Sequence, residues 1–215
     1  MSAHGAALRE RLRHVYWIGG GSGAGKSTIA RRIADAHGLC VYSTDDVMAE
    51  HARRSTREEC PLLHRFMAMD MDERWVNRSP HAMLDSFHWF RGEAFDMIVD
   101  DLLRLPREPA VIAEGFRLLP HLVGPLLAMP GHAVWLLPTP EFRQAVFASR
   151  GEPRAGFLAR TSDPERALRN LLERDRRFTE ILRDEATRLG MPVVEVDGGT
   201  TEDEVTGTVS GMLGL

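Results

Sequence analysis

The sequence predicts an α/β fold in which a five-stranded parallel sheet lies between two layers of helices. Each predicted strand is a short apolar run, and the five runs cover 14–18, 39–43, 110–114, 133–137 and 192–196. Turn residues or a helix start follow each run, and segments of helical period separate the runs. Continuous apolar runs that alternate with helices are typical of parallel strands buried on both faces. We therefore expect a three-layer α/β/α arrangement.

Several helix boundaries follow from end signals in the sequence. A helix over 27–37 is expected to end at Gly38, because glycine is the usual residue at a C-terminal cap. Two later helices are expected to begin at Thr139–Pro140 and Asp163–Pro164, where an N-cap residue precedes a proline. The second of these opens a long charged helix. The segment 200–205, TTEDEV, predicts the start of the last helix.

The segment between the second and third strands is out of proportion to the rest of the chain. Residues 46–109 carry no strand signal, whereas a crossover between parallel strands needs only about a dozen residues. We therefore predict a helical insertion there. No repeat or linker divides the chain, so its 215 residues are expected to form one domain.

Composition and charge exclude several classes of protein. A hydrophobic fraction of 43% and a charged fraction of 27% are ordinary for a globular protein. No apolar run approaches the roughly 18 residues that span a bilayer, and the first residues lack the apolar core of a signal peptide. A net charge of −4 argues against nucleic acid as a partner. We expect a cytoplasmic protein without a membrane partner, a monomer or homodimer, whose two cysteines stay reduced.

Residues 20–27, GGSGAGKS, match the phosphate-binding pattern G-x-x-x-x-G-K-[ST] between a predicted strand and a predicted helix. Glycines allow the tight turn in which successive N–H groups face phosphate oxygens, and the following helix adds its positive end. Lys26 is expected to reach the β- and γ-phosphates, and the Ser27 hydroxyl is expected to hold Mg²⁺. The predicted nucleotide-binding residues are Gly20, Gly21, Ser22, Gly23, Ala24, Gly25, Lys26, Ser27 and Thr28.

Lysine usage supports this interpretation of the loop. The chain has 27 basic residues, and Lys26 is its only lysine. An ammonium group is a compact point charge that fits a closed phosphate cradle, whereas a guanidinium group is planar and bulky. A chain that otherwise uses arginine therefore keeps lysine where the exchange is not conservative.

Acidic residues follow the second and third predicted strands. Asp45 comes first after the second strand, so we expect it over the crevice at the carboxyl end of the sheet, where it would take a proton from a hydroxyl group. Asp46 is a further candidate functional residue; the alternative for the pair is a helix N-cap with an acid in the first turn, a role that suits Asp46. Glu114 is expected to help hold Mg²⁺ or to bind an acceptor hydroxyl, with a surface turn as the alternative. Arg117 is expected to contact a phosphate or an anionic acceptor.

With these motifs the chain resembles the P-loop kinases that phosphorylate small molecules: shikimate and gluconate kinases, chloramphenicol phosphotransferase, the kinase domain of bacteriophage polynucleotide kinase, and the zeta toxins. The resemblance rests on the loop 20–27, on STDD at 43–46, on the acidic end of 110–114 and on the arginine-rich segment after the fourth strand. The insertion matches none of these proteins.

The resemblance implies a P-loop NTPase fold with strand order 2-3-1-4-5. It also implies transfer of the γ-phosphate of ATP, bound with Mg²⁺, to a hydroxyl group of a small molecule, with Asp45 as the base. A lid over 150–165 would close on the nucleotide, with Arg150 and Arg154 as catalytic residues and Arg160 as a further candidate. By contrast, Glu173 and Arg177 have the spacing of an ion pair on a solvated helix face.

The insertion is where we expect the acceptor to bind, because it follows Asp45 directly. Trp75, Arg78, His88 and Arg91 are the candidate acceptor-binding residues, beside Asp45 and Arg117, although most aromatic residues of the insertion suit a helix core equally well. Its charges leave a cationic and an anionic acceptor open, and sugar-like metabolites, sugar nucleotides and antibiotics all remain possible. A polynucleotide 5′-kinase and a non-catalytic ATP-binding module are the alternative functions.

Overall fold

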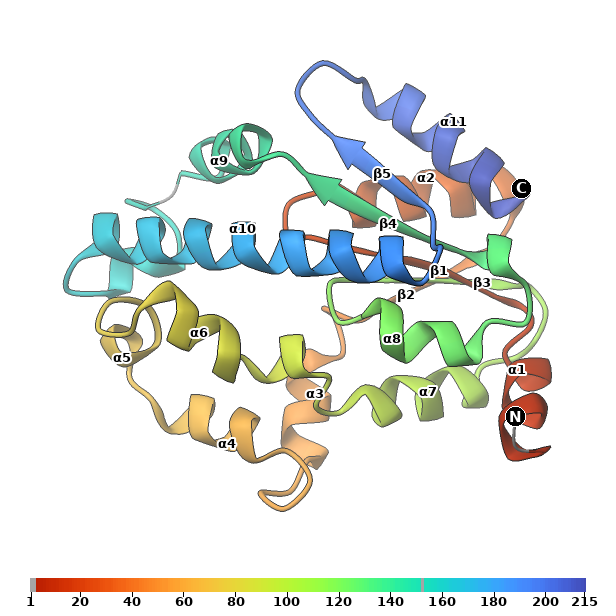
Figure 1. Ribbon diagram of the computed structural model, residues 1–215, viewed down its shortest axis with the longest axis horizontal. Helices are drawn as coiled ribbons and strands as arrows, with labels where there is room; N and C mark the ends of the chain where they lie inside the picture. Colours follow the sequence, from red (N-terminus) through yellow and green to blue (C-terminus); the bar gives the residue numbers. More distant parts are fainter. Residues whose placement is uncertain (1–2, 152) are drawn as a thin grey trace.

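The computed structural model describes residues 3–151 and 153–215, and it has a parallel sheet with helices on both faces (Figure 1). The strands are β1 (Val15–Gly20), β2 (Cys40–Ser43), β3 (Val111–Glu114), β4 (Ala133–Pro138) and β5 (Val193–Val196). They pair in the order β2-β3-β1-β4-β5, and every pair is parallel. The five predicted strands and their predicted order are therefore confirmed.

Alternate side chains of the strands select the two faces of the sheet. Trp17 and Trp135 belong to a buried cluster on one face, where α7, α8 and α10 pack. Ile18 and Leu136, each one residue further along, belong to the cluster on the other face, beneath α2 and α11. These helices are α2 (Lys26–His37), α7 (Phe95–Arg104), α8 (Pro120–Val123), α10 (Pro164–Arg188) and α11 (Glu202–Leu213).

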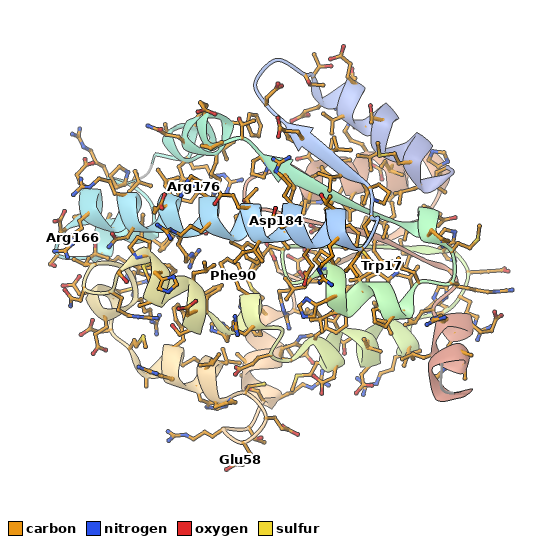
Figure 2. All side chains as sticks on the ribbon, viewed as in Figure 1. Trp17, Glu58, Phe90, Arg166, Arg176 and Asp184 are labelled. Atoms are coloured by element: carbon orange, nitrogen blue, oxygen red, sulfur yellow. The ribbon has the colours of Figure 1, made fainter. Side chains whose placement is uncertain are left out.

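The segment between β2 and β3 is helical throughout its regular parts, as predicted. Its elements before α7 are α3 (Met48–Arg54), α4 (Pro61–Ala68), α5 (Met71–Trp75), α6 (Pro80–Ser86) and the 3₁₀ turn η1 (His88–Arg91). Phe90 lies beside α10 in Figure 2, and its ring stacks on Phe178 with 3.5 Å between centroids. The insertion is thus packed against the long helix α10.

Side-chain caps begin the later helices where the sequence placed them. Thr139 caps α9 (Pro140–Ser149), Asp163 caps α10, and Thr201 caps α11 through a capping box with Glu204. The alternative that Asp45 and Asp46 supply an N-cap and a first-turn acid is wrong. The chain makes a further turn after β2, so α3 begins two residues later, with Val47 at its N-cap and no side-chain cap.

Two further expectations concern the whole chain. Both cysteines, Cys40 and Cys60, are free thiols. Across residues 3–151 and 153–215, no helix is both long enough and apolar enough to cross a bilayer.

Candidate active site

The loop after β1 turns tightly and is closed by a side-chain hydrogen bond. Gly23 and Gly25 both have left-handed backbone angles, with φ of +80° and +75°. A Cβ at Gly23 would lie 2.9 Å from the Arg143 guanidinium, so a larger residue would also collide there. Lys26, 7% exposed, donates from Nζ to the Gly21 carbonyl at 2.7 Å and closes the loop on itself. The loop ends at the N-terminus of α2, where an anion is favoured.

A cavity of about 280 Å³ lies directly over this loop. It combines residues from the P-loop, the end of β2, the segment after β3, and α9. Its lining residues are Ser22, Gly23, Gly25, Lys26, Ser27, Asp45, Phe116, Arg143, Phe147 and Arg150. All four segments lie at the carboxyl ends of the strands, where α/β sheets bind ligands. The structure therefore brings Lys26, Ser27, Asp45 and Arg150 into one cavity.

Ser27, which lines the cavity, and Glu114 form a pair of hard oxygen donors. The Ser27 hydroxyl donates to Glu114 Oε1 at 3.0 Å, and Glu114 is only 1% exposed. These donors suit Mg²⁺, which prefers few protein ligands and completes its shell with water and phosphate oxygens. In the described part of the chain, no group of three or more His, Cys, Asp or Glu side chains is arranged to hold a metal by itself. A metal at Ser27 would therefore depend on bound phosphates.

Burial and neighbouring charges have opposing effects on the pKa values of Lys26 and Asp45. Burial lowers the pKa of Lys26, while Glu114 and Asp45 raise it. Asp45 opens to solvent, but the protein around its carboxyl group still raises its pKa through desolvation; Lys26 lowers that pKa and Glu114 raises it. A phosphate between these groups would give the buried ammonium the anionic partner that favours its charged form.

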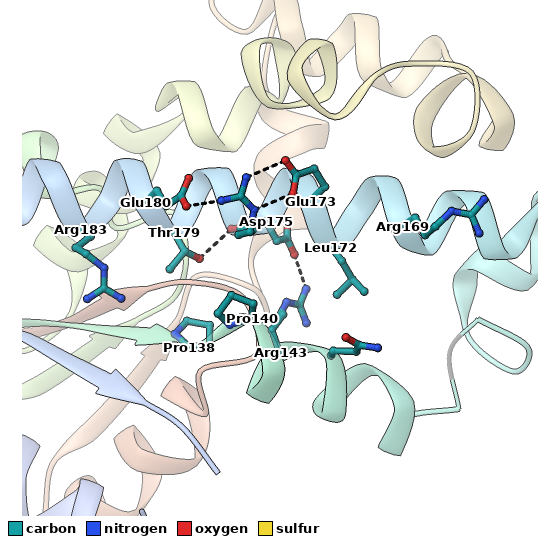
Figure 3. A pocket seen from close by; sticks show the side chains of 12 residues that line it. Pro138, Pro140, Arg143, Arg169, Leu172, Glu173, Asp175, Thr179, Glu180 and Arg183 are labelled. Carbon is teal, nitrogen blue, oxygen red and sulfur yellow. Dashed lines mark hydrogen bonds and ion pairs between the residues drawn. The ribbon is translucent and has the colours of Figure 1, made fainter. Parts of the chain in front are cut away.

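Arg143 is a site residue that the sequence analysis missed. Its guanidinium lies 3.8 Å from the Phe147 ring and donates to Asp175 Oδ2 at 2.5 Å, and its Nε is buried without a hydrogen-bond partner. Figure 3 shows Arg143 reaching from α9 toward Asp175 on α10. The cap at Thr139 was a usable signal, because it places the first turn of α9 at the carboxyl end of β4.

The first residue of the predicted lid, 150–165, lines the cavity, whereas later residues of the lid pack against the insertion. Arg150 lines the cavity, whereas Arg154 and Arg160 are exposed and do not line it. The 3₁₀ turn η4 (Phe157–Arg160) is packed down: Leu158 is 0% exposed. The Ser162 amide donates to Asp72 Oδ1 on α5 at 2.8 Å. The later half of 150–165 is thus held against the insertion.

The candidate acceptor residues of the insertion do not line the P-loop cavity. Trp75 is buried beside Phe147 and Leu158. Arg78 donates to the Ala82 carbonyl and to Ser86. His88 is buried, and burial lowers its pKa to about 3. Their roles in binding an acceptor remain predictions.

Arg91 and Arg117 also lie away from the P-loop cavity. Arg91 is exposed and lines a separate cavity beside Leu119, Phe178 and Leu182. Arg117 is buried, and its guanidinium bonds to protein groups rather than facing open space. A direct contact of either arginine with an acceptor remains a prediction.

No family model matches the sequence, and no curated protein matches it. Among solved structures, an uncharacterized protein from Eubacterium ventriosum has a TM-score of 0.45 and 13% identity, covering 93% of this chain and 97% of its own. The YorR protein from Bacillus subtilis, in complex with phosphorylated GDP, has 0.46 and 13%, covering 94% and 96%. A gluconokinase from Sinorhizobium meliloti has 0.45 and 16%, covering 95% and 93%. Sequence identities and TM-scores this low do not assign a reaction or a substrate to this chain.

Proposed function

We propose that the protein is an ATP-dependent kinase that transfers the γ-phosphate of ATP to a hydroxyl group of a small molecule. One observation carries this proposal: the P-loop, Lys26 and Asp45 line a single cavity, and Ser27, which also lines it, is hydrogen-bonded to Glu114. A phosphate cradle alone suits many functions. A cradle that shares a cavity with a carboxylate from the end of a neighbouring strand suits transfer to a hydroxyl group.

The P-loop would bind the triphosphate through its backbone N–H groups and the N-terminus of α2. Lys26 would leave the Gly21 carbonyl, which it now contacts at 2.7 Å, for the β- and γ-phosphate oxygens. Ser27, hydrogen-bonded to Glu114, would hold Mg²⁺. That ion, when bound with ATP, neutralises charge on the β- and γ-phosphates.

Asp45 would orient the acceptor and take its proton. The acceptor hydroxyl oxygen forms a bond to the γ-phosphorus while the bond from that phosphorus to the β–γ bridging oxygen breaks. ADP leaves with the electron pair of the broken bond, and the hydroxyl proton passes to the Asp45 carboxylate. Because the transition state is loose, the position of Asp45 matters more than its basicity.

Arg143 and Arg150 would stabilise the charge that spreads over the transferred group. Both line the cavity, and Arg143 is fixed by its ion pair with Asp175. Preorganised donors of this kind act most strongly where water is excluded. Phe116 and Phe147 supply apolar walls beside them. The acceptor would approach from the side of the insertion, as a sugar-like metabolite, a sugar nucleotide or an antibiotic.

The test is ADP release from ATP and Mg²⁺ across a panel of acceptors. The panel holds sugars, sugar nucleotides, aminoglycosides, nucleosides and a 5′-hydroxyl oligonucleotide. Lys26→Met is expected to lower acceptor-stimulated turnover about 10²- to 10³-fold, as the loss of an electrostatic contact to the reacting group does. Asp45→Asn is expected to lower it about 10²- to 10⁴-fold, the range for a general base.

Asp46→Asn is the matched control, because it makes the same change at the next residue, which is exposed and does not line the cavity. It is expected to leave turnover unchanged. Stimulation only by the oligonucleotide would replace the small acceptor with a nucleic acid. Tight ATP binding with no stimulation by any acceptor, and no effect of Asp45→Asn, would instead indicate a nucleotide-gated binding module.

A further inference from the structure

Arg117 is a buried cation in the segment after β3. It is 2% exposed, and among the described residues it forms no ion pair with a carboxylate. Instead, the guanidinium donates to the Thr44 carbonyl at 3.3 Å and to the Ala94 carbonyl at 3.2 Å. Its Cζ lies 4.0 Å from the centre of the Trp89 ring, a cation–π distance. A buried charge is costly unless it is hydrogen-bonded, so these partners must offset the cost of removing the guanidinium from water.

A histidine and an aspartate hold the orientation of this guanidinium. Arg117 Nη2 lies 3.1 Å from His51 Nδ1, and His51 is 0% exposed. Because an arginine only donates, Nδ1 must accept and the proton of the neutral ring must lie on Nε2. That Nε2 faces Asp101 Oδ2 at 2.7 Å. Asp101 therefore selects the tautomer of His51 that accepts from Arg117.

Asp101 is itself fixed by three further donors, one of which is Arg104 Nη1, 3.4 Å from Oδ1. The Tyr42 hydroxyl donates to Asp101 Oδ2 at 2.9 Å, and Arg54 Nη1 donates to Oδ1 at 3.4 Å. Tyr42 belongs to β2 and Asp101 to α7, so the contacts run from the segment after β3 through two helices to the strand β2. Hydrogen-bonded networks of this kind restrict the positions of every member.

The two carbonyl partners of Arg117 belong to two separate segments, the turn after β2 and the insertion. Thr44 directly precedes Asp45, and its own N–H donates to the Glu114 carbonyl at 2.9 Å. Ala94 lies in the insertion, and with φ of 59° it is the non-glycine residue with a left-handed backbone among those described. Such a conformation persists only where its surroundings enforce it. Arg117 thus joins the turn that carries Asp45 to a constrained point of the insertion.

We propose that Arg117, oriented by His51 and Asp101, is a positioning residue that fixes the Asp45 turn against the insertion, rather than a ligand of the acceptor. The catalytic part of this inference rests on the proposed function, whereas the holding of the turn does not. A guanidinium suits this role because its planar fork donates to several acceptors at once, which an ammonium cannot reproduce.

Hydrogen exchange tests the holding of the turn without any acceptor. The variants are Arg117→Lys and Asp101→Asn, and the readouts are the amides of Thr44 and Met48, which donate to Glu114 and Asp45. Both variants are expected to speed exchange at these amides about tenfold or more through local opening. Amides of β4 are expected to stay protected. Asp100→Asn, the same change at the preceding exposed residue of α7, is the control and is expected to change nothing.

Steady-state kinetics with a stimulating acceptor then separates positioning from binding. Both variants are expected to lower kcat about 10- to 100-fold, as a small misplacement of a catalytic group does, while KM for the acceptor and ATP affinity stay near the wild-type values. The double variant is expected to be no worse than Arg117→Lys alone, because Asp101 acts on the turn only through His51 and Arg117.

The outcomes distinguish the two proposals. Faster exchange in a protein that no acceptor stimulates would keep the positioning role and reject the kinase. A higher KM for the acceptor in Arg117→Lys, with Asp101→Asn silent in both assays, would overturn the positioning role and make Arg117 an acceptor ligand. If Arg117→Lys fails to fold, Asp101→Asn decides alone, and unchanged exchange at Thr44 and Met48 overturns the proposal.

Discussion

The P-loop and the insertion keep their shapes by different means. In the P-loop, the Lys26 ammonium bonds to Gly21, five residues earlier, and glycine angles set the turn. In the insertion, the Glu93 carboxylate accepts from the amides of Leu62 and Leu63, about thirty residues earlier. Asn170, on α10, donates to the Trp75 carbonyl at 3.0 Å. One region is therefore specified locally, and the other depends on buried polar contacts between distant segments.

This difference separates the two halves of the proposed chemistry. Phosphate binding needs one fixed arrangement for every acceptor, so a short motif suffices. On the proposed function, the insertion would supply the acceptor side, and its shape depends on a few long-range contacts. Asp175 on α10 is where the two halves meet. It bonds to Arg143 beside the P-loop and to Arg174, which lies within 4.6 Å of the Phe87 ring of the insertion.

The largest effect is expected from replacing Asp175, which contacts both regions. Asp175→Ala leaves the buried guanidinium groups of Arg143 and Arg174 without their carboxylate. Breaking a buried pair in this way is expected to lower the free energy of unfolding by about 3–5 kcal/mol. Urea denaturation measures it. Asp184→Ala, at an exposed position of the same helix, is the control and is expected to stay within about 0.5 kcal/mol of the wild type.

The docking of η4 on the insertion can be broken separately. Leu158 is fully buried beside Trp75 and Phe147, so Leu158→Ala is expected to cost about 3 kcal/mol through lost burial and a residual cavity. Hydrogen exchange at the Ser162 amide should also become faster, because this amide donates to Asp72 of α5, where the segment after η4 meets the insertion. Leu189→Ala, at a 40% exposed position, is the control. Equal losses from both variants would contradict a packed η4.

The sheet and the P-loop were predictable because their signals are local. An apolar run of five residues reports a buried strand, and the pattern from Gly20 to Ser27 contains every residue type that the cradle needs. Caps such as Thr139 and Thr201 are similarly short-range. The order of the strands came from the family resemblance rather than from the residues themselves.

The remainder of the site was not predictable from spacing. Arg143 becomes a site residue through Asp175, which lies 32 residues later in a helix that reads as a solvated charged surface. That interpretation holds for Glu173 and Arg177, which do pair on the helix, but the buried face of the same helix carries charges too. Arg117 likewise depends on His51, 66 residues away. No one-dimensional pattern reports which of many arginines will meet a buried partner.

His88 allows the insertion to be weakened by pH. Burial first, and then the charges of Arg117, Arg174 and Arg74, lower its pKa from 6.5 to about 3. Between these values the unfolded chain binds one more proton than the folded chain, so stability falls as the pH is lowered. Relative to His88→Leu, the wild type is expected to lose about 2 kcal/mol from pH 8 to about pH 5. Urea titrations at each pH measure the difference, and a constant difference would show that His88 charges in the fold.

The smallest expected effects come from helix-cap variants, and they test whether the insertion unfolds separately from the sheet. α5 and α11 each begin with a capping box, Asp70 with Glu73 and Thr201 with Glu204. Asp70→Ala and Thr201→Ala are each expected to cost about 1 kcal/mol. If the long-range contacts make the insertion unfold with the sheet, both variants shift the urea midpoint equally. If the insertion opens alone, Asp70→Ala leaves that midpoint unchanged and speeds exchange only at nearby amides such as Ser162. The contacts through Arg117, Asp175 and Phe90 span the boundary, so we expect the equal shift.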